Sequence, residues 1–536
     1  MCMPPLAADA VTSTSTTTTS RVVATVRASA CTGRSRNKTI PFKRPADVLG
    51  KSRSSDGTDT DINDKNQNSH SCFARIQSIL FMASASALHF AGFEFARSGT
   101  IALFTSSKTG FASASASPLS TICMTPFSIL VLWLYTKSLE RWGPWKCLNI
   151  STVLFALLLA SSAGILRTLE ILMDNSTDFD EGRGVQVLQR LAQTTIFSLN
   201  VAQSSFVQLL YTQHWSFIGS VSKEWEGATV WFAPIAGLGS IASTLAALGV
   251  QPVIQRWGLT GSLGISSIFL LSSGCAADVA YRIANRHCFE PSRKEDTGNH
   301  SNKRQDVHSH SASLVETSRR LFSRVPILVN LCIEVLTCQS VSSVINFLFL
   351  LKVKECIPND QQRASWTATW YARINFFSGV LQFGVLPLLM KHWKSKSDNN
   401  NGNSNQQHKV WLVMPMFMMA SATLMSYQTE HLSLLLVTVS FALYKTLEYS
   451  VRGVAVEMVY VNLDYESRFF GKEVIGLFVD RLGKSSTAVV LSLVPYHFGD
   501  TESLDKAFVQ ALSVGSLVWL AASYPLANPK RKDKMQ

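Results

Sequence analysis

The stretch from Leu443 to Ser486, LYKTLEYSVRGVAVEMVYVNLDYESRFFGKEVIGLFVDRLGKSS, concentrates charge in an otherwise apolar part of the chain. It holds sixteen acidic, basic or tyrosine side chains and lies between two strongly apolar segments. An ionised side chain inside hydrocarbon costs upward of about 2.5 kcal/mol, so such groups normally face a wet cavity or the membrane interface. The region outside this stretch decides whether a membrane is involved.

Apolar residues are frequent and clustered along the rest of the chain. Hydrophobic residues make up 46% of the 536 positions and charged residues 16%, and the mean hydropathy is +0.15. That composition is too apolar for a soluble protein with two long polar segments. Windows of about 20 residues with few charges, long enough to cross about 30 Å of hydrocarbon, recur. We predict twelve spans, at 77–104, 115–136, 147–166, 192–213, 229–250, 260–281, 326–351, 368–390, 410–428, 431–449, 473–496 and 507–527.

Windows this long and continuous are helical in lipid, because a helix satisfies every backbone N–H and C=O within one segment. The predicted fold class is therefore an all-α polytopic membrane protein with about twelve transmembrane helices. The charged residues at 450–472 are then expected in a loop between the tenth and eleventh spans.

Loop charges orient the chain. Both terminal regions and the 137–146, 282–325 and 391–409 loops are net basic, whereas the 167–191 loop and the last hairpin are rich in acids. By the positive-inside rule both termini face the cytoplasm or its topological equivalent. The net charge of +13 then reflects contact with the anionic leaflet of a lipid bilayer, so no nucleic-acid partner is expected.

The long polar connection at 282–325 divides the spans into two sets of six. We therefore predict a first six-helix half at 76–281, a basic linker at 282–325, a second six-helix half at 326–527 and a basic tail at 528–536. This layout resembles that of major-facilitator-type carriers, whose halves rock around a site at the bilayer midplane.

Residues 1–75 form a separate zone that is rich in Ser and Thr, and up to Arg53 it is basic and nearly free of acids. That composition is typical of an organelle transit peptide. A disordered cytosolic tail fits the same composition, so both interpretations stay open.

Three short sequences share an acid or amide, an arginine and a glycine: Glu140-Arg141-Trp142-Gly143-Pro144-Trp145-Lys146, Gln255-Arg256-Trp257-Gly258 and Asp480-Arg481-Leu482-Gly483-Lys484. Glycine suits a tight turn between spans, while the acid and base can clamp helix ends. We expect Asp480, Arg481 and Lys484 to gate or brace the cytosolic side.

No arrangement of residues typical of an enzyme appears. The spans contain no paired carboxylates, no HExxH, no glycine-rich nucleotide loop and no nucleophile elbow. The ten cysteines have no metal-ligand spacing, so neither a zinc site nor a disulfide framework is indicated. We predict a protein that is not an enzyme and has no metal or cofactor.

Ionisable side chains inside predicted spans are candidates for a binding site. Glu94 and Arg97 are three residues apart, as are Lys445 and Glu448, so each pair can neutralise itself on one helix face. Arg373 has no acidic residue within a turn, and an unpaired guanidinium favours an anion, supplied by another helix or by a substrate. Further polar residues in spans are Gln203, Glu334, Asn346 and Asn375.

The charged stretch also resembles the end of the TLC-type ATP/ADP translocases, the nucleotide transporters of plastids and obligate intracellular bacteria. The matching residues are Tyr449-Ser450, Glu457-Met458, Tyr460, Leu463-Asp464, Glu466, Gly471-Lys472, Asp480 and Arg481 to Ser485. Weaker matches elsewhere are Leu134 to Lys137, Pro234, Gly237, Gly239, Leu351-Lys352 and Pro358 to Asp360.

The resemblance implies a membrane carrier that exchanges ATP and ADP by alternating access and is not an enzyme. It also implies that the plastid envelope is a candidate location. Arg97 and Arg373 correspond to lysines of the family's first and eighth spans and are expected to bind phosphate. Gln203 stands where the family has a glutamate, and Val456 where it has a lysine before Glu457. These departures leave open a different nucleotide, another anionic substrate or lost transport.

The resulting candidate substrate-binding residues are Arg97, Gln203, Asn346, Arg373 and Lys445, with Trp370, Tyr371 or Phe376 available to stack a base. The candidate gating or structural residues are Glu457, Asp464, Asp480, Arg481 and Lys484. Two other functions stay open: a major-facilitator carrier of an unrelated solute, and a membrane scaffold that transports nothing. The sequence does not indicate an oligomeric state.

Overall fold

The computed structural model describes residues 59–106, 109–111, 116–175, 183–222, 229–287, 289, 291, 314–357, 360–389, 410–428, 432–461, 463–497 and 501–528. Residues 1–58 of the predicted N-terminal segment 1–75, most of the 282–325 linker, the 391–409 loop and nearly all of the basic tail lie outside these residues. The chain divides into two compact units, Met1–Gln67 and Asn68–Gln536. The helical assembly below belongs to the second unit.

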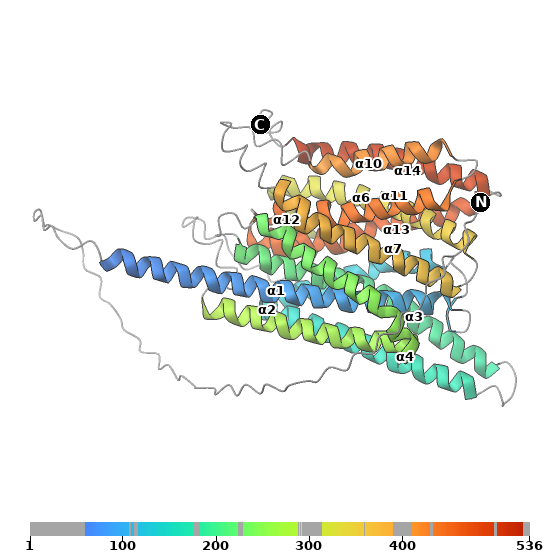
Figure 1. Ribbon diagram of the computed structural model, residues 1–536, viewed down its shortest axis with the longest axis horizontal. Helices are drawn as coiled ribbons and strands as arrows, with labels where there is room; N and C mark the ends of the chain where they lie inside the picture. The colour runs from blue at the N-terminus through green and yellow to red at the C-terminus, as the bar shows by residue number, and fades with distance from the viewer. Residues whose placement is uncertain are drawn as a thin grey trace, which may run out of the picture. The chain divides into compact units, whose positions relative to one another are not determined.

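Helices account for nearly all of the described residues, and no strand occurs among them (Figure 1). The first predicted half contains α1 (Asp59–Thr105), α2 (Ala116–Asn175), α3 (Arg183–Ser222) and α4 (Thr229–Arg286). The second contains α5 (Leu314–Arg324), α6 (Pro326–Cys356), α7 (Asp360–Val380), the π-helix η3 (Leu381–Val385), α10 (Val410–Ser426), α11 (Leu434–Leu447), the π-helix η5 (Glu448–Arg452), α12 (Gly453–Val461), the π-helices η6 (Ser467–Gly471) and η7 (Val474–Val479), α13 (Asp480–His497) and α14 (Thr501–Ala527).

Two of the three glycine sequences are turns. Gly143 (φ 75°, ψ 174°) and Gly258 (φ 73°, ψ −178°) break the long helices α2 and α4 in a conformation that is essentially restricted to glycine. Each break separates two of the predicted spans. The third sequence differs, because Gly483 lies inside α13, where a Cβ would come within 2.8 Å of the Leu336 carbonyl oxygen of α6. That glycine serves close helix packing rather than a turn.

Seven described helical stretches are long and apolar enough to cross a membrane, and two of them are the broken helices α2 and α4. The others are Phe73–Phe104, Pro326–Cys356, Thr369–Leu389, Leu434–Val461 and Ser503–Ala527. All twelve predicted windows fall on helical segments. These findings confirm an all-α polytopic membrane fold, while the count of twelve spans stays a prediction.

The prediction of a loop at 450–472 is wrong. Helix continues through η5 and α12 to Val461, and it resumes at Tyr465 before η6. Charges that suggested a loop are buried and paired instead: Lys472 Nζ lies 2.6 Å from Glu457 Oε2, and both side chains are almost fully enclosed. A charge that is matched inside the protein does not need water, so the helices run on through the charged stretch.

Apolar packing forms a core in each half and a third core between them. In the first half α2 packs against α3 and α4, and in the second α14 packs against α6 and α10. The third core joins Leu132 of α2 and Leu209 of α3 to Leu328 of α6 and Ile475 of η7. Contacts of α4 with α7 and of α2 with α13 complete this junction, which is where the polar residues gather.

Candidate functional site

Arg97 and Glu94 form an ion pair on one face of α1. The two side chains are three residues apart, and Arg97 Nη2 donates to Glu94 Oε2 at 2.5 Å. Asn375 of α7 donates to the other oxygen of Glu94 at 3.2 Å, and the Arg97 guanidinium lies 3.9 Å from the ring centroid of Tyr371. Tyr371 and Asn375 are one turn apart, so the same face of α7 covers the pair.

Lys445 and Glu448 form a second pair where α11 passes into η5. Lys445 Nζ donates to Glu448 Oε2 at 2.6 Å and to the Ser342 hydroxyl of α6 at 2.9 Å. Gln339, one turn earlier on α6, donates to the other oxygen of Glu448 at 3.2 Å. Both predicted i, i+3 pairings are therefore confirmed, and each pair is also held by a second helix.

A tyrosine lies beside the cation of each pair. The Arg97 guanidinium faces the ring of Tyr371, and Lys445 Nζ lies 5.7 Å from the ring centroid of Tyr449. We call Arg97, Tyr371, Lys445 and Tyr449 the central cluster. Arg97 belongs to the first half of the chain and the other three residues to the second, so the central cluster spans the junction between the halves.

In each pair the cation is more exposed than its carboxylate. The exposed fractions of the side chains are 15% for Arg97 against 4% for Glu94, and 13% for Lys445 against 9% for Glu448. The carboxylates lie behind the cations and compensate their charge, which lowers the cost of holding them in the membrane interior. The accessible groups of the central cluster are thus positive or aromatic.

A third pair lies next along the same helix. Arg452, at the end of η5, donates two hydrogen bonds to Glu334 of α6, both at 3.0 Å. The indole of Trp519 on α14 donates to Oε1 of the same carboxylate at 3.0 Å. This cluster ties three helices of the second half together.

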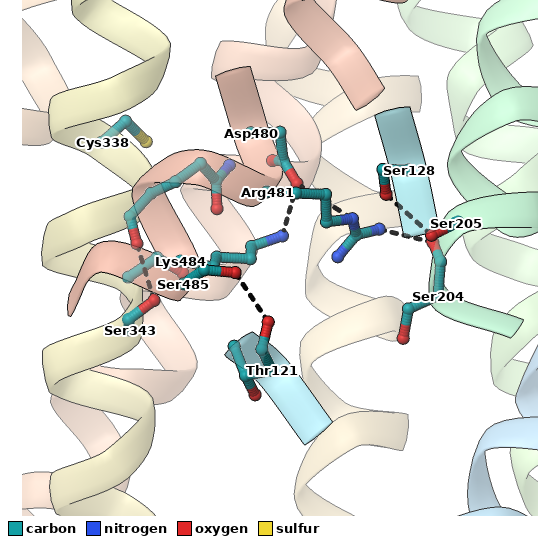
Figure 2. A network of polar contacts seen from close by, with 12 residues as sticks. Thr121, Ser128, Ser204, Ser205, Cys338, Ser343, Asp480, Arg481, Lys484 and Ser485 are labelled. Carbon is teal, nitrogen blue, oxygen red and sulfur yellow. Dashed lines mark hydrogen bonds and ion pairs between the residues drawn. The ribbon is translucent and has the colours of Figure 1, made fainter. Parts of the chain in front are cut away.

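Asp480, Arg481 and Lys484 lie near the middle of the helical run 465–497, because helix begins at Tyr465, well before the predicted span at 473–496. Lys484 donates to Asp480 at 2.9 Å, and Arg481 donates to the backbone carbonyl of Ser204 on α3 (Figure 2). Ser485 donates to the carbonyl of Thr121 on α2 at 2.6 Å. These residues connect α13 to the first half.

Asp464 lies just before the helix that begins at Tyr465. Its carboxylate accepts from Arg324 of α5 and from the backbone N–H of Ser467. The same guanidinium donates to Glu466 at 3.0 Å. Glu457 pairs with Lys472 between α12 and the helix that begins at Tyr465. Asp464 and Glu457 therefore brace the short connection around residue 463.

The structure does not bring every predicted binding residue to the central cluster. Arg373 is exposed on α7, 4.7 Å from the Trp370 ring centroid, and it is two positions from both Tyr371 and Asn375. A step of two residues is about 200° around a helix, so Arg373 projects away from Arg97. Gln203 is buried and accepts from Thr100. Asn346 is partly buried, one turn beyond Ser342.

Sequence reasoning missed Tyr449 and Arg452 as part of this network. Arg452 follows Lys445 by seven residues and Glu448 by four, which places all three on one face of a helix. That spacing would have been visible had the tenth span been extended beyond residue 449. Within the described ranges no group of three or more His, Cys, Asp or Glu side chains could hold a metal ion.

Comparison with known proteins connects this site to a transporter family. Residues 408–528 match the family model described as TLC ATP/ADP transporter. The matched region contains the whole charged stretch, which confirms the resemblance seen in the sequence. No curated protein matches the chain.

Solved structures identify the fold. A bacterial homologue of the iron transporter ferroportin in an outward-facing state is 12% identical with a TM-score of 0.56, over 84% of this chain and 99% of that chain. The proton:xylose symporter XylE of the major facilitator superfamily is 11% identical with a TM-score of 0.53, over 85% of this chain and 95% of that chain. The human organic anion transporter MFSD10 is 10% identical with a TM-score of 0.52, over 84% and 99%. The chain is a multi-pass membrane transporter with a major-facilitator-like fold.

Proposed function

We propose that this divergent relative of the TLC ATP/ADP transporters exchanges ATP and ADP, or a closely related phosphorylated anion, by alternating access. One observation carries the proposal: Arg97 of the first half lies 3.9 Å from the ring centroid of Tyr371 in the second half, where Lys445 also lies beside Tyr449. A site built from both halves changes its geometry when the halves rock, as alternating access requires.

The chemistry of the central cluster suits a nucleotide. Guanidinium and ammonium groups donate charge-assisted hydrogen bonds to phosphate oxygens. The Tyr371 ring already lies against the Arg97 guanidinium, whereas Tyr449 is 37% exposed and can stack against a purine ring. We assign phosphate binding to Arg97 and Lys445 and base stacking to Tyr449.

The buried acids keep the empty site stable. Without substrate, Glu94 and Glu448 balance the two cations. When an anion binds, its phosphate oxygens accept hydrogen bonds from Arg97 and Lys445.

The other predicted site residues take supporting roles. Gln203 anchors α1 to α3 through Thr100, and Asn346 extends the α6 face that carries Gln339 and Ser342. Glu457, Asp464, Asp480, Arg481 and Lys484 brace the helices around the junction. Arg373 projects from the far face of α7, which makes it a matched control for Arg97.

Uptake into proteoliposomes tests the proposal. Labelled ATP should enter vesicles preloaded with ADP much faster than empty vesicles, and unlabelled nucleotides should compete while sugars and dicarboxylates should not. Equal uptake by preloaded, empty and protein-free vesicles would exclude nucleotide exchange. Uptake that responds only to a pH gradient and to another solute would favour a different major-facilitator carrier.

We further propose that both termini face the cytoplasm, and that the organelle membrane is a plastid envelope. The basic loops support this orientation. The composition of residues 1–53 supports the organelle assignment. A fluorescent tag at the C-terminus should colocalise with the envelope and should be removed by protease without permeabilising the membrane. Localisation to another membrane would refute the plastid assignment without affecting the transport proposal.

A further inference from the structure

Gln382 of η3 connects the two halves of the chain through one amide group. Its oxygen accepts a hydrogen bond from the Ser240 hydroxyl of α4 at 2.8 Å, and its nitrogen donates to the backbone carbonyl of Tyr449 in η5 at 2.9 Å. The side chain is almost fully buried. Ser240 belongs to the first half, whereas Tyr449 belongs to the central cluster.

Gln382 and Tyr449 both lie in π-helical turns, η3 and η5. A π turn widens the helix and often marks a functional position. One turn before Gln382, Ser378 donates to the carbonyl of Thr446 at 3.3 Å. Two side chains of the α7–η3 helix therefore hold the backbone of η5 and the residues before it.

The junction of α4 with α7 and η3 is also closely packed. A Cβ on Gly237 would lie 2.5 Å from the Phe383 ring, and a Cβ on Gly379 would lie 3.6 Å from Ser240. A rocking motion that separates these surfaces also breaks the bond between Ser240 and Gln382. That event would release the amide that fixes Tyr449.

We propose that Gln382 is a positioning residue that couples the arrangement of the two halves to the shape of the central cluster. While Ser240 holds the Gln382 oxygen, the amide nitrogen is aimed at the Tyr449 carbonyl and the η5 turn stays fixed. When Ser240 withdraws, the amide can rotate, η5 loosens and Tyr449 leaves its place beside Lys445. The role of Tyr449 in binding rests on the proposed function, but the mechanical link does not.

Hydrogen–deuterium exchange without substrate tests the mechanical link. Ser240→Ala removes the hydrogen bond from Ser240 to Gln382. In this variant, amides of residues 445–453 should exchange about threefold to tenfold faster than in the wild type, which is the factor expected for one lost hydrogen bond. Ser240→Thr keeps a hydroxyl and should restore slow exchange. Ser243→Ala, a buried serine on the same helix, should leave exchange in 445–453 unchanged.

Two further variants separate coupling from simple packing. Gln382→Ala should accelerate exchange in 445–453 as much as the double variant Ser240→Ala/Gln382→Ala, because both residues act through one amide. Additive effects, or unchanged exchange in Ser240→Ala with a normal melting temperature, would overturn the proposal.

Nucleotide binding to the same variants tells the two proposals apart. Ser240→Ala should weaken ATP binding about threefold to tenfold, and Ser240→Thr should restore it. If wild-type protein binds no nucleotide while the exchange result holds, the coupling stands and the substrate assignment falls. If ATP binding is normal in Ser240→Ala although 445–453 exchange faster, Tyr449 is not coupled to binding and the proposal is overturned in that respect.

Discussion

Arg452 and Glu334 form a two-point ion pair in the interior of the second half, with both nitrogen–oxygen distances at 3.0 Å. The residues are 118 positions apart in the sequence. Their pairing illustrates why a charged stretch such as Leu443 to Ser486 is compatible with buried helix, since a charge of the stretch is neutralised here by a residue of another helix.

Breaking this pair should destabilise the protein strongly. Arg452→Met leaves the Glu334 carboxylate buried with only the Trp519 indole as a donor, and an uncompensated buried charge costs about 3–5 kcal/mol. We expect a clear fall of the melting temperature in detergent. The double variant Glu334→Gln/Arg452→Met should recover much of the loss. A control is Lys137→Ala, which breaks an exposed pair with Glu140 and should change stability by less than about 1 kcal/mol.

A side chain at Gly237 should crowd the Phe383 ring where α4 meets η3. Gly237→Ala places a Cβ 2.5 Å from the Phe383 ring, and overpacking of this kind costs about 1–3 kcal/mol. Transport should fall because the halves no longer close. Gly379→Ala, whose Cβ meets its nearest neighbour at 3.6 Å, is the matched control and should be near normal. Rescue of Gly237→Ala by Phe383→Leu would identify the ring as the cause, whereas equal effects of the two alanines would contradict this account.

Gly258 should be irreplaceable for a conformational reason. Its φ of 73° with ψ of −178° lies in a region occupied essentially by glycine alone, and other residues there cost about 1–3 kcal/mol. Gly258→Ala should therefore lower the melting temperature although open space surrounds a Cβ at this position. Gly164→Ala, inside α2 and equally uncrowded, should stabilise by up to about 1 kcal/mol. A stable Gly258→Ala protein would refute the strained turn between these spans.

Much of the fold and part of the site follow from the sequence. Long apolar windows predict membrane helices because hydrocarbon demands internal backbone hydrogen bonds, and spacing of three residues predicts the Glu94–Arg97 and Lys445–Glu448 pairs. Spacing within one helix does not reveal partners on another. Tertiary packing determines that Glu334 is the partner of Arg452 and that Tyr371 lies beside Arg97. It also determines the direction in which Arg373 projects.

The helix ends were the least predictable feature. Charge density at 450–472 indicates a loop only if those charges are unpaired, and the pairing of Glu457 with Lys472 removes that condition. The π turns at η3 and η5 were likewise invisible, because no residue type marks them. The first of these errors placed Arg452 in a loop, whereas it lies at the end of η5.

The central claim is that Arg97 and Lys445 bind the phosphates of a nucleotide across the junction between the halves. The most direct measurement is the dissociation constant for ATP of purified protein, compared among wild type, Glu94→Gln/Arg97→Gln and Arg373→Gln. The double variant removes both charges of a pair, so no buried carboxylate is left unpaired. Loss of one charge-assisted contact should weaken ATP binding about tenfold to hundredfold, while Arg373→Gln should bind like the wild type. Normal ATP affinity in the folded double variant, or a greater loss in Arg373→Gln, would contradict the account.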